Sequence, residues 1–375
     1  MPINLDPSER IKYGREITAA SAYKSFLRSF IGAGDDAIIK TKLEESSAGK
    51  GKQSLLGLRA PLLGAGVESN TDFSANEDTI QYLYQAVPFQ IFGNSLRSNT
   101  RALEERAIAS FRAESKPALE DWAATQTDRR LIVALTKDCT NIAACDASNG
   151  VKAANATATI AAGDILTTAT IDKLVQRARE GKDGAGNPHP RVRPVSVKLG
   201  KNPAGIEIYQ RRWVLLIGSN QAAQLRNDPV WIAAQSEAAE RGASNPIFTG
   251  EIGAYNGVTV VDWDTWSSVS AGVLTSDSSF TTIEGTTSFS SYAGATGRVT
   301  EIGLFLGATA GLMPQDDGFR YYEDHDDDLG RKTRVGIDRG IGFAKAHWLG
   351  ETPAEKQSVY HNKDYGVIAV VSSKE

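Results

Sequence analysis

The residues best suited to chemistry lie in one acidic stretch between positions 316 and 328. Carboxylates at this density could hold a divalent cation. Asp324, Asp326 and Asp328 alternate as calcium-loop ligands do, but Leu329 stands where that loop needs glycine and Val335 where it needs glutamate. The stretch therefore predicts a solvated charged turn or a contact surface more strongly than a metal site. Its acidic residues are Asp316, Asp317, Glu323, Asp324, Asp326, Asp327 and Asp328.

The other reactive residue types do not form a catalytic set. The string from Ser21 to Lys24 matches the S-x-x-K sequence of some acylating enzymes, but its companion motifs are missing. The four histidines have no metal-ligand spacing, and the spacing of Cys139 and Cys145 fits neither a redox nor a zinc motif. The sequence contains no P-loop, no G-x-S-x-G and no H-E-x-x-H. These observations favour a structural or binding protein over an enzyme.

The composition is that of an ordinary protein with a sizeable core. The 375 residues are 41% hydrophobic and 23% charged, with 41 basic and 45 acidic residues. This balance argues against a dedicated nucleic-acid or anionic-membrane surface, which shows as a basic excess. No apolar run reaches the length of a membrane span, and the polar N-terminus predicts no signal peptide. Two cysteines leave disulfides no stabilising role, which fits a reducing cytoplasm.

A long amphipathic helix is predicted from Ser98 to Lys137. Apolar residues recur there at three- and four-residue spacing, and good helix formers separate them. Pro117 removes a backbone donor, so we expect a kink or a break at that residue. Without a break the helix would span roughly 50–60 Å at 1.5 Å per residue. Such a helix is typical of the spine of an elongated subunit.

Two segments precede this helix. A capping box at Asp6–Glu9, with Pro7 at the first helical position, predicts an amphipathic helix that Gly32 and Gly34 end. Strand-like flanks at 37–39 and 55–68 enclose a polar stretch at 44–54. We interpret these flanks and their polar tip as a long protruding β-hairpin.

Helices and strands are predicted to follow the long helix. Residues 265–297 are rich in Ser, Thr and Gly and are predicted to be a surface insertion with some β character. The other predicted elements are a helix at 165–179 closed by Gly181, a buried strand at 206–217, a helical stretch at 219–242 broken at 227–229, a tight turn at Asn256-Gly257, a buried strand and turn at 298–313, alternating strands at 319–349 and a buried strand at 365–372.

The region from Trp213 to Val258 carries two specific strings. Leu225–Trp231 has the form L-R-x-D-x-x-W, and Asn245–Val258 has the form N-P-I-F-x-G-x-x-G-x-Y-N-G-V. With the strand that precedes them, they resemble the signature block of the major capsid proteins of N-four-like tailed bacteriophages. Further segments match in the same order, namely Phe30–Lys40, Leu62–Val67, Asn76-Glu77 and Asp364–Ile368.

The resemblance extends over about residues 26–370 and is weakest at 44–54 and 265–297. It implies an α+β subunit with the Hong Kong 97-type phage capsid fold. The implied parts are an N-terminal arm at 1–34, an extended E-loop at 35–78, a peripheral domain at 79–164 with its spine helix at 98–137, an axial α/β domain at 165–315 that includes the insertion, and return strands of the peripheral domain at 316–375.

The resemblance also implies a function without a cofactor or bound metal. The chain is expected to self-assemble into hexamers and pentamers of an icosahedral shell around double-stranded DNA, which it contacts without sequence specificity. Portal, scaffolding and decoration proteins are implied as partners, a membrane is not, and assembly is expected in the host bacterial cytoplasm. Two alternatives stay open: a metal-dependent enzyme that uses the carboxylates at 316–328, and a non-viral compartment shell of the same fold.

Three groups of residues are expected to contact neighbouring subunits. Leucines of the E-loop should bury apolar surface, arm residues should pack under an adjacent subunit, and acidic residues should meet basic ones of a neighbour. The E-loop residues are Leu55, Leu56, Leu58, Leu62 and Leu63; the arm residues are Ile17, Tyr23 and Leu27; the charged residues are Glu323, Asp324, Asp326, Asp327, Asp328, Arg331, Lys332 and Arg334.

Overall fold

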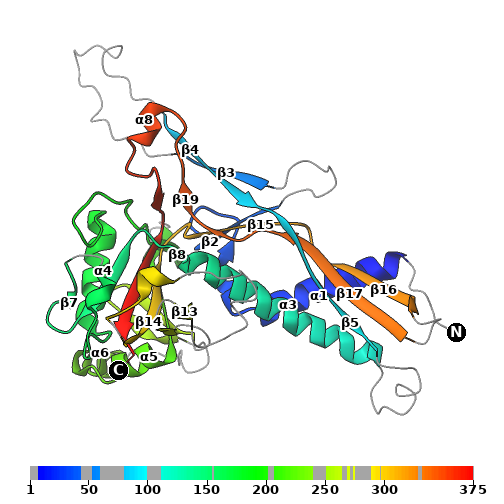
Figure 1. Ribbon diagram of the computed structural model, residues 1–375, viewed down its shortest axis with the longest axis horizontal. Coiled ribbons are helices and arrows are strands. Elements are labelled where there is room, and N and C mark those ends of the chain that lie inside the picture. Colours follow the sequence, from blue (N-terminus) through cyan, green and yellow to red (C-terminus); the bar gives the residue numbers. More distant parts are fainter. Residues whose placement is uncertain are drawn as a thin grey trace. The chain divides into compact units, whose positions relative to one another are not determined.

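The chain folds into two compact units, each assembled from three separate stretches. Unit 1 comprises Met1–Ser54, Val87–Ala134 and Gly311–Ala344, and unit 2 comprises Leu55–Ala86, Leu135–Ala310 and Lys345–Glu375. Both units contain helices and strands, which confirms the α+β expectation (Figure 1). The computed structural model describes residues 7–43, 53–59, 80–98, 111–153, 156–201, 207–239, 251–263, 268–270, 273–274, 289–295, 297–327 and 332–374.

Unit 1 combines two long helices with one mixed sheet. Within the described residues the strand order is β1-β2-β15-β17-β16, with β18 added to β15 and β5 added to β17. The helices are α1 (Pro7–Lys24), the 3-10 helix η1 (Phe26–Phe30) and α3 (Phe111–Thr136). The strands are β1 (Ile31–Gly32), β2 (Ile39–Leu43), β5 (Gln90–Arg97), β15 (Gly311–Gln315), β16 (Arg320–Asp327), β17 (Lys332–Ile341) and β18 (Ala344–Lys345).

Helix α1 begins at Pro7, as predicted, but ends at Lys24, before the predicted end near Gly32. The backbone turns into an extended conformation at Ser25. There Asp128 of α3 accepts two hydrogen bonds, from the Ser25 hydroxyl at 2.7 Å and from the Phe26 N–H at 2.8 Å. A tertiary contact therefore ends the helix, and a pattern of apolar spacing does not reveal such a contact.

The spine helix begins later than predicted within the described residues. Ser98 follows strand β5 and donates its backbone N–H to the Thr333 carbonyl. Residues 99–110 lie outside the described residues, and α3 begins at Phe111. The helix continues through Pro117 as one element, so of the expected kink or break the break does not occur.

The described strands of the predicted hairpin between 37–39 and 55–68 do not pair with each other. Strand β2 instead joins the sheet of unit 1, where it runs parallel to β1 and to β15. Strand β3 (Gln53–Arg59) pairs with β4 (Tyr82–Pro88) in a separate two-stranded sheet, which we call the β3–β4 ribbon. Each flank thus has a strand-like sequence, as predicted, but pairs with a partner distant in the chain.

Unit 2 contains a sheet of ten strands within the described residues. Its order is β10-β11-β9-β14-β21-β6-β7, with β12 beside β14, β13 beside β12, and β8 beside β9. The strands are β6 (Ile142–Asp146), β7 (Gly150–Val151), β8 (Val195–Lys201), β9 (Glu207–Ile217), β10 (Glu251–Tyr255), β11 (Val258–Asp262), β12 (Ser268–Ser270), β13 (Val273–Leu274), β14 (Val299–Leu306) and β21 (Val367–Ser373).

Helices and one small sheet complete unit 2. Helix α4 ends at Gly181, whose φ of 68° is the left-handed conformation that glycine adopts readily. The helices are α4 (Thr168–Glu180), α5 (Ser219–Arg226), α6 (Pro229–Ala239), α8 (Pro353–Lys356) and the 3-10 helices η4 (Thr157–Thr159) and η6 (Ser290–Tyr292). The small sheet pairs β19 (His347–Trp348) with β20 (Lys363–Asp364).

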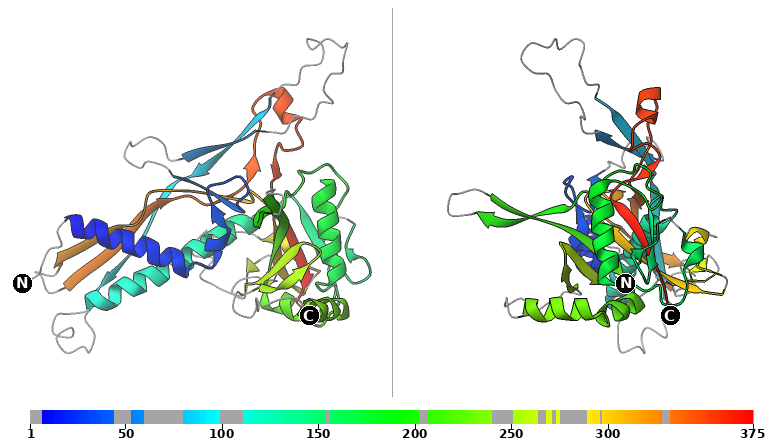
Figure 2. Two further views of the ribbon diagram at one scale, coloured as in Figure 1. Left: turned by 180° about the vertical axis from the view of Figure 1, so that it is seen from behind. Right: turned by 90° about the vertical axis from the view of Figure 1, so that its left-hand side faces the viewer.

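The core of unit 2 confirms several local predictions. All seven residues of β21 are buried, and β9 provides the predicted strand before α5 and α6. Asn256 and Gly257 have φ values of 46° and 78° and form the predicted tight turn between β10 and β11. Strand β9 pairs with β11 along 213–217 and with β8 along 207–212, where the two strands form a ribbon (Figure 2). No helix among the described residues is long and apolar enough to cross a membrane.

The division of the chain differs from the implied domains in several places. Of the implied return strands at 316–375, β16 and β17 belong to unit 1, but residues 345–375 belong to unit 2, where β21 lies between β14 and β6. Strand β15 belongs to unit 1, although the axial domain was expected to reach residue 315. The described parts of 265–297 are not only surface, because β12 extends the sheet and Phe289 and Tyr292 are buried.

Candidate intersubunit surface

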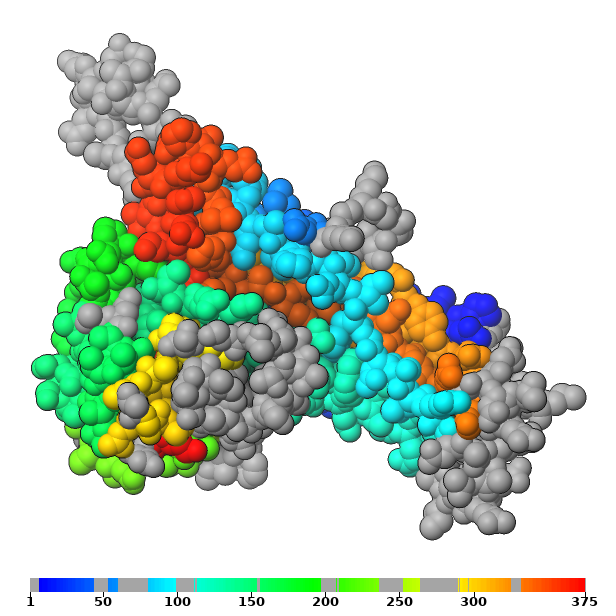
Figure 3. Space-filling view, in the orientation of Figure 1, coloured from blue at the N-terminus to red at the C-terminus, as the bar shows by residue number. Residues whose placement is uncertain are grey.

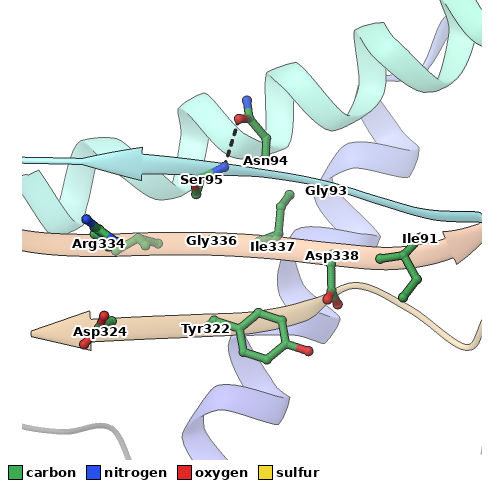
Figure 4. Close-up of a pocket in the computed structure, with 11 residues that line it drawn as sticks. Ile91, Gly93, Asn94, Ser95, Tyr322, Asp324, Arg334, Gly336, Ile337 and Asp338 are labelled. Atoms are coloured by element: carbon green, nitrogen blue, oxygen red, sulfur yellow. Dashed lines mark hydrogen bonds between the residues drawn. The ribbon is translucent and has the colours of Figure 1, made fainter. Parts of the chain in front are cut away.

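Strands β5, β17 and β16 of unit 1 present two faces of opposite character. Side chains alternate along a strand, so every second residue points to the same face. On one face Phe92 stacks on Trp122 of α3, with ring centroids 4.7 Å apart. On the same face Tyr321 stacks on Tyr13 of α1 at 5.5 Å. The helices lie behind the three strands in Figure 4 and cover this face.

The opposite face holds a shallow groove of about 460 Å³. Its centre is a row across the three strands, in which Ser95, Gly336 and Tyr322 lie directly opposite one another (Figure 4). The next row on this face contains Gly93, which likewise has no side chain to fill the groove. The hollow therefore exists because glycines occupy two strand positions that would normally carry side chains.

The two glycines have different structural roles. A Cβ on Gly93 would lie 2.4 Å from the Ile337 carbonyl oxygen, so the close approach of the two strands requires glycine there. A Cβ on Gly336 would meet its nearest neighbour, the Ser95 Cβ, at 3.4 Å. The fold would accept a side chain at Gly336, and its absence only deepens the groove.

Large apolar side chains border the groove. Ile91 is 78% exposed and Tyr322 is 47% exposed. Strands β5 (cyan) and β17 (orange) run side by side at the surface of unit 1 in Figure 3. A single exposed hydrophobic residue is unremarkable, but apolar residues gathered around a concave surface are typical of a protein-binding site.

The β3–β4 ribbon exposes an apolar face of its own in unit 2. Strand alternation buries Leu56 and Leu83 and leaves Leu55 59% exposed beside the partly exposed Tyr82 and Tyr84. Of the predicted E-loop contacts, Leu55 is exposed, Leu58 is half-buried, and Leu56 is buried within its own chain. Leu62 and Leu63 lie outside the described residues. The two tyrosines were missed, although their alternation with Leu83 could have identified them.

The arm prediction needs correction for two of its three residues. Ile17 and Leu27 are fully buried within unit 1, so their side chains have no surface left for a neighbour. Tyr23 is 77% exposed, and the Arg28 guanidinium lies over its ring at 4.3 Å. Tyr23 is therefore the one predicted arm residue that is available for an intersubunit contact.

The residues of the predicted charged contact lie mainly on two paired strands. Asp324 lies directly opposite Arg334, and Asp327 opposite Lys332, in the antiparallel pairing of β16 with β17. Asp324 and Arg334 therefore occupy paired positions within one chain, and their contact with a neighbouring subunit stays a prediction. Glu323 is buried in unit 1, Asp326 belongs to β16, and Asp328 and Arg331 lie outside the described residues.

The acidic stretch does not assemble a metal site in the described part of the chain. No group of three or more His, Cys, Asp or Glu side chains lies close enough to hold a metal ion there. Asp316 instead forms an ion pair with Arg320, with 3.0 Å between Oδ2 and the guanidinium. The geometry thus offers the metal-dependent alternative no ligand set among the described residues.

Comparisons with known proteins identify the family of the chain. The major structural protein ORF14 of Helicobacter pylori bacteriophage KHP30 is 28% identical, and the match covers 97% of this chain and 95% of that protein. The head structure of Helicobacter pylori bacteriophage KHP40 has a TM-score of 0.72 at 27% identity and covers 94% of this chain and 91% of that chain. The capsid of Ralstonia phage GP4 has a TM-score of 0.66 at 20% identity over 94% and 91% of the chains, which shows a shared fold. Because a family model described as phage capsid protein matches residues 4–374, the chain belongs to the phage capsid protein family.

Proposed function

We propose that the chain is the major capsid protein of a tailed bacteriophage and self-assembles into the hexamers and pentamers of an icosahedral shell around double-stranded DNA. Family membership and the similar head and capsid structures support this function. The observation that carries this proposal is that one chain has both the exposed apolar face of the β3–β4 ribbon and the groove at Gly93 and Gly336. The Hong Kong 97-type assignment is consistent with these likenesses, and the narrower resemblance to N-four-like phages stays a prediction.

The proposed contact places the β3–β4 ribbon of one copy in the groove of its neighbour. Leu55 is the protruding apolar residue of the ribbon, and Gly336 leaves the hollow that would receive it. Burial of apolar surface contributes about 25 cal/mol per Å². Each such contact is weak, but a closed symmetric shell repeats it in every subunit, and the repeated contacts hold the assembly together.

Other expected contacts remain parts of this proposal. Tyr23 is the candidate of the N-terminal arm, and charged residues at subunit borders would make assembly sensitive to salt. Portal, scaffolding and decoration proteins, non-specific contact with packaged DNA, and assembly in the host cytoplasm belong to the same proposal. A non-viral compartment shell would differ in its contents, so nucleic acid inside purified particles would separate the two functions.

A disulfide cross-link tests the proposed contact directly. Leu55→Cys and Ser95→Cys in one chain would place thiols on the ribbon and in the groove, while the native Cys139 and Cys145 are buried and do not compete. Oxidation of assembled particles should give a ladder of covalent multimers. Leu55→Cys combined with Ser148→Cys, at an exposed turn, serves as the control and should stay monomeric. Assembled particles of the first variant that yield only monomers would refute the contact.

A further inference from the structure

A buried carboxylate organises the polar interior of unit 2. Asp364 is fully buried and accepts hydrogen bonds from Lys345 Nζ at 2.9 Å, from His347 Nδ1 at 2.9 Å and from the Thr140 backbone N–H at 2.7 Å. A buried charge is tolerated only when it is paired and hydrogen-bonded in this way. The pairing also keeps the pKa of Asp364 below its ordinary value although burial opposes this.

Both ring nitrogens of His347 face oxygen atoms, which favours the doubly protonated ring. Nδ1 faces the Asp364 carboxylate, and Nε2 faces the side-chain oxygen of Asn362 at 3.0 Å. A neutral imidazole has a single N–H, so it can serve only one of these acceptors. The hydrogen bond with Asp364 accordingly raises the pKa of His347.

His189 lies on the other side of Asp364. The Asp364 N–H donates to the Thr140 hydroxyl oxygen at 3.0 Å, and this oxygen lies 3.1 Å from His189 Nε2. Nδ1 of His189 then donates to the Pro190 carbonyl at 3.3 Å. Burial lowers the pKa of His189, which favours its neutral form. One chain of hydrogen bonds therefore joins two histidines whose pKa values are shifted in opposite directions.

The same segment fastens the β3–β4 ribbon to the rest of unit 2. Gln85 of β4 accepts the His347 backbone N–H at 2.7 Å and donates its amide to the Lys345 carbonyl at 2.7 Å. Tyr84 and Leu349 exchange backbone hydrogen bonds of 3.0 and 3.1 Å. Movement of Lys345 or His347 would therefore move the base of the ribbon.

We propose that His189, Thr140, Lys345, His347 and Asp364 form a proton-gated clasp that fixes the base of the β3–β4 ribbon. The clasp acts within one chain, and its use in shell assembly rests on the proposed function. It holds the base of the ribbon through Gln85 and Tyr84. Its opening would release the ribbon without unfolding the sheet of unit 2.

The two histidines set opposite limits to the clasp. The pKa of His347 is raised, so its contribution is complete below the ordinary value of 6.5 and is lost as pH rises through its folded pKa. The pKa of His189 is lowered, so its contribution is complete above 6.5 and is lost as pH falls through its folded pKa. The clasp is closed between these two values. The charged side chains that act on the two rings are Asp364, Lys345, Lys363 and Asp183.

Histidine C2-proton exchange, read by mass spectrometry on the unassembled full-length chain, measures the pKa of each ring. We expect His347 above 6.5 and His189 below it. In parallel, amide exchange corrected for intrinsic rates should show protection at 82–88 and 345–349 falling as pH rises through the pKa of His347. Both pKa values on the same side of 6.5, or amide protection that does not change with pH, would overturn the proposed clasp.

Two variants separate the clasp from general stability. In His347→Gln, amide protection at 82–88 should no longer fall as pH rises, because glutamine does not titrate. His361→Gln is the control, since His361 accepts the Gly350 N–H and takes no part in the clasp. If amide protection at 82–88 still falls with rising pH in His347→Gln, the role of His347 is refuted. These measurements need no shell, so their failure would leave the proposed function untouched, and a failure to assemble would leave the clasp untouched.

Discussion

Replacing Gly336 by valine separates the stability of the fold from the function of the groove. The nearest atom to an added Cβ is 3.4 Å away, so the isolated chain has room for it. Glycine inside a strand costs about 0.5–1 kcal/mol relative to a residue with a side chain, and valine is favoured in strands. We therefore expect Gly336→Val to leave the free energy of unfolding unchanged or to raise it by up to about 1 kcal/mol.

The same substitution should weaken assembly, although it leaves the fold as stable as before or more stable. The valine methyl groups would occupy the hollow that we propose for the neighbour's Leu55, and overpacking of a fitted interface costs about 1–3 kcal/mol. At 1.4 kcal/mol per tenfold change, the concentration for half-maximal assembly should rise roughly 5- to 140-fold for each groove that the valine blocks. Gly336→Ala, which adds one methyl group, should fall between valine and the parent chain.

Light scattering against protein concentration measures assembly, and denaturant unfolding of the unassembled chain measures stability. Gly34→Val is the matched control, because Gly34 is exposed and an added Cβ there would lie 4.0 Å from its nearest neighbour. It should leave assembly unchanged. A folded Gly336→Val chain that assembles at the parental concentration would refute the proposal that a neighbour occupies the groove.

Three further predictions concern unit 2. Tyr292→Phe removes a buried hydroxyl that accepts the Cys139 N–H at 3.0 Å and donates to the Thr136 carbonyl, so denaturant unfolding should show a loss of about 1–3 kcal/mol; an unchanged midpoint would contradict these bonds. Burial raises the pKa of Cys139 to about 11 and that of Cys145 to about 12, so both thiols should react with a thiol reagent at mildly alkaline pH only after unfolding. Rapid reaction of the native chain would be inconsistent with their burial. Gly257→Ala forces a side chain onto a φ of 78° and should cost about 1–2 kcal/mol in thermal unfolding; no loss would argue against the left-handed turn.

Local patterns predicted the elements that depend on local interactions. The turn at Asn256-Gly257, the buried strand that became β21 and the closure of α4 at Gly181 follow from residues only a few positions apart. Each needs only the preference of one residue type for a backbone conformation, or a run of apolar residues. The resemblance to phage capsid proteins added the family, which periodicity could not supply.

Partner choice over long distances could not be predicted in the same way. Strand β2 has a strand-like sequence, but nothing in it indicates that residues 311–315 would become its parallel partner. Ile17 has the apolar character of an interface residue and of a core residue alike, and the fold buries it. The groove was missed because Gly93 and Gly336 lie on different strands. The sequence alone does not show that the two strands pair and that both glycines share one face of the sheet.

Electron microscopy of the purified chain, with light scattering on the same sample, tests the central claim most directly. The account predicts closed shells or capsomer-sized rings that appear above a threshold concentration. Purified chain that stays monomeric up to high concentration, also with a crowding agent or added salt, would contradict self-assembly as its function.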